Sequence, residues 1–196
     1  MKKLLSFVFF VFIWVVAFAQ ESSTIESSVN TTIDDKKEIK EPTKARRVNK
    51  DKILNIVNEY RNDGWNCTGT KIIPVREVTW SDKLTYIAEC HSRDMHDYSV
   101  SLGNPNYHYL SHIGSNGYTL EDRLVENDYY SVIFVENIAY FEYDEDGVIN
   151  QWLDSPEFCK NIMRSEVTEI GVGRVGNYWT MILAKPKTNI NMETKF

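Results

Sequence analysis

The chain has 196 residues, with 22 Lys and Arg against 28 Asp and Glu, and a formal net charge of −6 at neutral pH. An acidic chain without a basic cluster is poorly suited to nucleic acid, because neutralisation of phosphates supplies most of that affinity. We therefore exclude nucleic acid as a partner, and the length suits a single globular domain.

Residues 1–19 are predicted to be a secretory signal peptide. Lys2 and Lys3 precede an apolar run at residues 4–16, and Ala-Phe-Ala at 17–19 matches a cleavage pattern. An uncleaved membrane anchor is the alternative, although the run is short for a span of about 20 residues. We expect no stable membrane insertion after cleavage. Either interpretation places the rest of the chain outside the cytoplasm, as a secreted, periplasmic or cell-surface protein.

Three further regions follow from composition. Residues 20–50 carry Ser, Thr and charges of both signs but almost no large apolar side chains, so burial cannot offset the entropy of ordering them. We predict a disordered polar linker there. Residues 51–187 form the folded domain, and residues 188–196 are predicted to be a loose C-terminal tail.

The first part of the domain is predicted to be helical. Apolar residues recur at helical spacing over residues 51–63, and Gly64 ends the run. Ser81 is a natural N-cap for a second helix that runs to about Tyr98. The apolar stripe of this second helix contains Leu84, Ile87, Ala88, His91 and Met95, so His91 is interpreted as a core residue.

Short helices and strands fill the second part. Thr119 and Ser155 are predicted to cap short helices, with Pro156 at a first position where its missing N–H costs nothing. A further helix is predicted over residues 147–154. Residues 132–141 favour a strand because β-branched and aromatic side chains dominate. The strands at 169–175 and 178–184 flank Gly-Asn, a two-residue hairpin signal.

Eight short motifs then occur in a fixed order between residues 52 and 185. They are VNEYR (57–61), VTWSDKL (78–84), HSRDM (91–95), LSH followed by two glycines (110–117), DRL (122–124), ENIA (136–139), WLDSP (152–156), and EIGVG with YWT (169–180). Together they resemble the CAP superfamily of cysteine-rich secretory, antigen 5 and pathogenesis-related class 1 proteins, and its bacterial SCP-like extracellular domains. The order of elements gives an α+β class. The resemblance implies a three-layer α-β-α sandwich with a small, mainly antiparallel central sheet.

The resemblance also implies a shallow cavity in which two histidines and one or two acids converge, in some members around zinc or another divalent ion. The first histidine falls on His112 and the main acid on Glu136. The second histidine falls on Phe158, and an acid of eukaryotic relatives falls near Ser155. The candidate cavity therefore consists of His112, Glu136, Ser155 and Phe158, with the Phe158 ring expected to pack over the His112–Glu136 pair.

The metal site is predicted to be degraded. Zinc takes three or four nitrogen, sulfur or carboxylate ligands, and phenylalanine supplies none. His108 precedes His112 by four residues, which on a helix would place both on one face, as in zinc proteases. Nearby Pro105 and Gly114 indicate a loop instead. We expect no cofactor, with weak binding of zinc or another divalent ion as the alternative.

The odd number of cysteines predicts one thiol outside an intramolecular disulfide. Cys67, Cys90 and Cys159 would lie in an oxidising compartment, where disulfides persist. The resemblance implies a Cys67–Cys159 bond, and Cys67–Cys90 is the alternative. Cys90, at the edge of the apolar stripe of its helix, is expected to be a buried free thiol.

Two functions remain open from the sequence. The first is a non-enzymatic extracellular binding module for a small apolar molecule, a glycan or a protein, favoured by the aromatic residues in the central third of the chain. The second is a metal-assisted hydrolase that acts on peptide or cell-envelope substrates through His112 and Glu136. Phe158 favours binding over catalysis because it removes a metal ligand.

Overall fold

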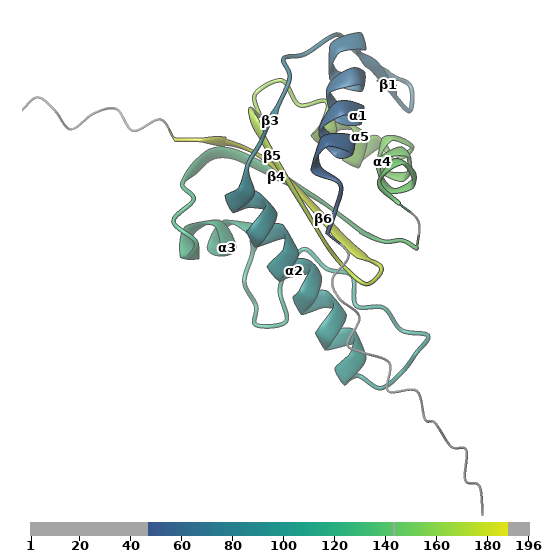
Figure 1. Cartoon of the computed structure of the whole chain (residues 1–196), viewed down its shortest axis with the longest axis vertical. Helices are drawn as coiled ribbons and strands as arrows, with labels where there is room; N and C mark the ends of the chain where they lie inside the picture. Colours follow the sequence, from purple (N-terminus) through teal and green to yellow (C-terminus); the bar gives the residue numbers. More distant parts are fainter. Residues whose placement is uncertain (1–46, 143, 188–196) are drawn as a thin grey trace, which may run out of the picture. The chain divides into compact units, whose positions relative to one another are not determined.

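A computed structural model describes residues 47–142 and 144–187. The signal peptide and tail predictions, and nearly all of the linker prediction, fall outside these residues. In the described part of the chain, no helix has the length and apolar character needed to span a membrane. The elements are α1 (Lys50–Asp63), β1 (Trp65–Cys67), β2 (Thr70–Ile72), β3 (Thr79–Trp80), α2 (Asp82–Ser101), α3 (Leu120–Glu126), β4 (Ser131–Tyr140), α4 (Glu145–Leu153), α5 (Pro156–Ile162), β5 (Glu169–Val175) and β6 (Tyr178–Pro186) (Figure 1).

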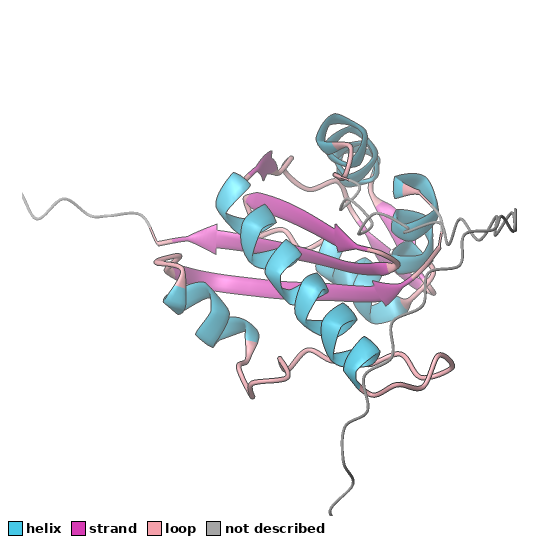
Figure 2. Ribbon diagram, turned by 60° about the horizontal axis from the view of Figure 1, so that its bottom comes forward, coloured by secondary structure: helices cyan, strands magenta, loops and turns pink. Residues whose placement is uncertain are grey.

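These elements form three layers around a four-stranded sheet. The strand order is β3-β5-β6-β4, in which only the short β3–β5 pair is parallel. The long helix α2 crosses one face of the sheet, and α1, α4 and α5 lie on the other side (Figures 1 and 2). The predicted α+β class and α-β-α sandwich are confirmed, and β4 is the edge strand from which the candidate site is built.

Helix α2 lies unusually close to β5 because β5 carries glycine where a side chain would collide. A Cβ on Gly171 would be 2.3 Å from the Thr85 backbone nitrogen, and a Cβ on Gly173 would be 2.2 Å from that of Glu89. The buried stripe of α2 is the predicted one, and it includes His91. Ser81 caps the helix by accepting a hydrogen bond from the Leu84 N–H, also as predicted.

The opposite face holds the largest core cluster. Trp152 and Trp179 are fully buried there, and their indole N–H groups donate to the carbonyls of Ile138 and Phe141 at 3.2 and 3.1 Å. The predicted hairpin is present, with Gly176 at φ 57° in its turn. Helix α4 begins two residues earlier than predicted because the Asp144 side chain accepts from the Gly147 N–H and caps it.

The disulfide prediction is confirmed and the prediction for the third cysteine is half correct. Cys67 and Cys159 are bonded, with their Cα atoms 5.5 Å apart, which ties the unpredicted β1–β2 hairpin to α5. Cys90 is free, but it is exposed and not buried. It lies at the edge of the buried stripe of α2, and its side chain faces solvent.

Candidate functional site

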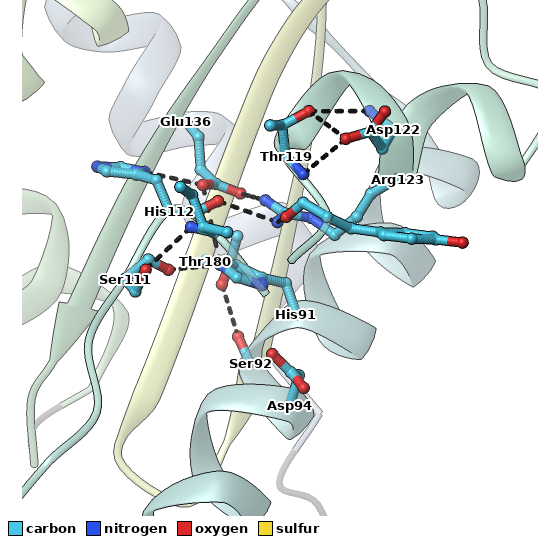
Figure 3. A network of polar contacts seen from close by, with 12 residues as sticks. His91, Ser92, Asp94, Ser111, His112, Thr119, Asp122, Arg123, Glu136 and Thr180 are labelled. Carbon is cyan, nitrogen blue, oxygen red and sulfur yellow. Dashed lines mark hydrogen bonds and ion pairs between the residues drawn. The ribbon is translucent and has the colours of Figure 1, made fainter. Parts of the chain in front are cut away.

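A buried carboxylate in β4 organises the candidate site. Side chains alternate along a strand, so Glu136 points to the α2 face while Asn137 points to the α5 face. The Glu136 side chain is only 3% exposed. Its Oε2 accepts a hydrogen bond from Arg123 Nη2 at 2.5 Å, and its Oε1 accepts from His112 Nδ1 at 2.8 Å (Figure 3). Both carboxylate oxygens are therefore engaged by side chains of the protein itself.

Helix α3 positions the arginine. Thr119 and Asp122 form a capping box at its start, which holds the first turn in place. Arg123 follows directly, and its Nη1 donates to the carbonyls of His112 at 3.0 Å and Tyr118 at 3.2 Å. One guanidinium thus joins the loop after His112 to the carboxylate of β4.

A second imidazole approaches the carboxylate from α2. His91 Nε2 donates to the Ser111 carbonyl at 2.9 Å and lies 3.9 Å from Glu136 Oε1. Burial lowers the pKa of His91; the nearby Arg123 guanidinium lowers it further, and the Glu136 carboxylate partly opposes this. A carbonyl accepts only from an N–H, so the proton is on Nε2 and the lone pair is on Nδ1.

The structure brings together two of the predicted cavity residues, His112 and Glu136. Phe158 packs against the core cluster of α1, α4 and α5, and its carbonyl accepts from Asn137 Nδ2 at 3.1 Å. The prediction that the Phe158 ring packs over His112 and Glu136 is wrong for His112, because the His112 side chain is 54% exposed. Ser155 occupies the N-cap position of α5, as predicted, but its side chain makes no capping hydrogen bond.

His108 belongs to a different part of the surface. Its ring stacks on Tyr140 with centroids 3.7 Å apart, and its Nδ1 lies 3.5 Å from the Tyr178 hydroxyl oxygen, beside a cavity of about 360 Å³. Residues 104–118 are turns and loop, so the four-residue spacing to His112 does not put both rings on one helix face. Within residues 47–142 and 144–187, no group of three or more His, Cys, Asp or Glu side chains is arranged to hold a metal ion.

Sequence reasoning missed Arg123 and the polar role of His91. His91 is buried, as predicted, yet its ring faces the site. A signal for Arg123 was available, because a carboxylate predicted inside a strand needs a cation to remain charged. The capping pattern Thr119-x-x-Asp122 would then have placed Arg123 in a helix, directly after the capping box.

The family model described as the cysteine-rich secretory protein family, CAP, matches residues 54–182. The chain therefore belongs to this family. It is 29% identical over 120 residues to a protein of Bacillus subtilis described as the uncharacterized membrane protein YlbC. That match covers 59% of this chain but only 32% of the relative, so the chain spans about a third of the length of that protein.

Solved structures agree on the fold. An extracellular protein of Bacillus anthracis that contains an SCP domain is 25% identical, with a TM-score of 0.55 over 69% of this chain and 39% of that one. An outer surface protein of Borrelia burgdorferi is 18% identical, with a TM-score of 0.51 over 74% of this chain and 100% of that one. Because the Borrelia protein is only 18% identical to this chain, that match supports the fold alone.

Proposed function

We propose that this chain is an extracytoplasmic CAP-domain protein that binds a ligand without catalysing a reaction. The predicted signal peptide supports the location. The description of one similar structure, an extracellular protein of Bacillus anthracis, agrees with it. A non-enzymatic role is supported by the chemistry of the residues around Glu136.

The observation that carries the proposal is the engagement of Glu136. A carboxylate that acts as a base or a metal ligand needs an accessible oxygen lone pair. Here the side chain is 3% exposed, Arg123 holds one oxygen at 2.5 Å and His112 holds the other at 2.8 Å. Freeing the oxygen that Arg123 holds would leave a buried charge without its cation, which is strongly unfavourable. The carboxylate is therefore best understood as a structural anchor.

The same residues do not fit a zinc ion. A tetrahedral site takes three or four ligands, and the Arg123 guanidinium already occupies the position of a cation beside the carboxylate. Phe158 offers no ligand atom where many relatives have histidine. We therefore derive no chemical step through a metal at this site.

The alternative remains a metal-assisted hydrolase of peptide or cell-envelope substrates. One observation favours it: His112 donates its Nδ1 proton to Glu136, as metal-binding histidines commonly do toward a carboxylate. This leaves Nε2 of a half-exposed ring as a possible ligand or base. A single nitrogen is too few for a tight site.

A hydrolysis assay separates the two functions. The mature protein, with and without added zinc, is incubated with a mixed peptide library and with purified cell-envelope polymer, and the products are followed by mass spectrometry. We expect no cleavage above a buffer control. Cleavage that disappears in His112→Ala would overturn the proposal. Because that side chain is half exposed, the variant should remain folded.

A further inference from the structure

The cavity of about 360 Å³ beside His108 lies between the C-terminal end of α2, the loop at residues 103–108, the end of β4 and the start of β6. Tyr140 and Tyr178 are directly opposite each other in the β4–β6 register, so their side chains lie on the same face of the sheet. This is the face that α2 covers, because Tyr178 packs in one cluster with Met95 from the buried stripe of α2. The cavity is therefore built by helix, loop and sheet together.

Aromatic rings form much of the cavity wall, and several are held in place. The His108 ring stacks on Tyr140 with an interplanar angle of 15°, and Tyr178 meets Tyr140 edge to face with centroids 4.9 Å apart. The hydroxyl of buried Tyr178 is hydrogen-bonded to Ser99 Oγ at 2.7 Å. Tyr107 also lines the cavity and is 49% exposed. A ligand would thus meet preformed ring faces and one ring that is open to solvent.

Neutral polar groups of the same cavity are open to a ligand. The Tyr140 hydroxyl makes no hydrogen bond to any described residue, and it is not among the buried polar atoms that lack a partner, so solvent reaches it. His108 is exposed, and its Nε2 also has no partner in the described part of the chain. The Asn104 side chain accepts from the Asn106 N–H through Oδ1, which leaves its NH₂ group as a donor. Each group can exchange water for a ligand hydroxyl.

The lining restricts the chemistry of the ligand. Charged residues make up 26% of the chain, yet the described residues that line this cavity include no Lys, Arg, Asp or Glu. A charged ligand would lose hydration without meeting an opposite formal charge. A purely apolar ligand, such as an acyl chain, would remove water from Tyr140, His108 and Asn104 without replacing those hydrogen bonds. A neutral sugar avoids both costs, because its C–H face packs on rings while its hydroxyls bond the polar groups.

We propose that this cavity binds a neutral saccharide. The volume lies at the lower end of the range for small-molecule sites, which suits about one or two sugar units. The rings supply apolar contact area, and the neutral polar groups orient the sugar. This inference rests on the proposed binding function and names its ligand class.

Saturation-transfer-difference NMR on the mature natural protein tests the ligand class. The probes are glucose, galactose, mannose, N-acetylglucosamine and a disaccharide of each, with titration of any sugar that binds. We expect saturation transfer to at least one of these neutral sugars. Its charged counterpart, glucuronic acid for glucose or glucosamine for N-acetylglucosamine, should bind about tenfold more weakly because the cavity offers no opposite charge.

Variants locate the bound sugar. Tyr107→Ala removes a half-exposed ring, so folding is not at risk, and it should weaken binding about tenfold. Tyr140→Phe keeps the stacked ring and removes only the open hydroxyl, which should weaken binding about fivefold. Tyr130→Ala is the matched control, since this tyrosine is 54% exposed and does not line the cavity. It should bind as the natural protein does.

Absence of saturation transfer to every neutral sugar would overturn the inference. Equal binding of the charged counterpart would also overturn it, as would binding that is unchanged in both cavity variants. This measurement reads occupancy, whereas the hydrolysis assay reads turnover. No sugar binding and no cleavage would remove this ligand class and leave the proposed binding function standing. Sugar binding together with cleavage that is lost in His112→Ala would overturn the proposed function and leave the sugar site standing.

Discussion

The proposed structural role of the site depends on the contacts of one side chain, Glu136. Its carboxylate joins β4 to α3 through Arg123 and to the preceding loop through His112. His91 on α2 lies beside the same oxygen that His112 contacts. Four successive segments, which are α2, the loop after it, α3 and β4, thus meet at one buried charge, and their contacts offset the cost of burying it.

His91 leads to a prediction about pH. Burial lowers its pKa, so between the unfolded value near 6.5 and the lower folded value the unfolded chain binds more protons. The stabilisation from neutral His91 is therefore complete above about pH 6.5 and is lost as the pH falls below it. We expect the free energy of unfolding to drop by up to about 1.4 kcal/mol per pH unit below 6.5.

Urea unfolding at pH 7.5 and pH 5.5 measures this loss. The variant His91→Phe, which cannot take up a proton there, should show a smaller difference between the two pH values. An identical pH dependence in the variant and the natural protein would show that other groups cause the loss.

At the scale of elements, the packing of α2 on β5 depends on glycine. Replacing Gly173 with alanine would put a Cβ 2.2 Å from the Glu89 nitrogen, a backbone atom that cannot move without shifting the helix. We expect Gly173→Ala to lower the free energy of unfolding by about 3 kcal/mol, as overpacking does.

Gly117→Ala is the matched control for that measurement. No heavy atom lies within 4 Å of its added Cβ, although its φ of 87° is unfavourable for alanine. It should therefore cost only about 1 kcal/mol of backbone strain. Similar losses of urea stability for the two variants would contradict the packing argument.

Elements with a strong local pattern could be predicted from the sequence, and those without one could not. The stripe of α2 and the Gly176-Asn177 turn are local signals, and both elements formed as predicted. The strands β1, β2 and β3 have three, three and two residues, which is too short for periodicity to show. The pairing of β3 with β5 also depends on residues about 90 positions apart.

At the scale of the whole molecule, the disulfide closes a long covalent loop within the domain. Cys67 and Cys159 are 92 residues apart in the sequence. Loop-closure entropy predicts that Cys67→Ala combined with Cys159→Ala lowers the free energy of unfolding by about 4–5 kcal/mol. Urea unfolding tests this, and Cys90→Ala serves as a control that should change stability by less than about 0.5 kcal/mol because the residue is exposed.

The site could be predicted only in part, because some of its residues come together only when separate elements pack against each other. His112 and Glu136 were found because the family resemblance assigns them, and they do meet. Arg123 and His91 become site residues only once α3 and α2 are packed beside β4, which local patterns do not report. The exposure of Cys90 was missed because a position at the edge of a helical stripe can face either way.

The central claim is that the Glu136 cluster is structural and does not hold a metal. Isothermal calorimetry of zinc into the mature natural protein, with His112→Ala alongside, tests it most directly. We predict no binding tighter than about micromolar, which corresponds to roughly 8 kcal/mol. Tight zinc binding by the natural protein that is lost in His112→Ala would contradict the claim and favour the hydrolase.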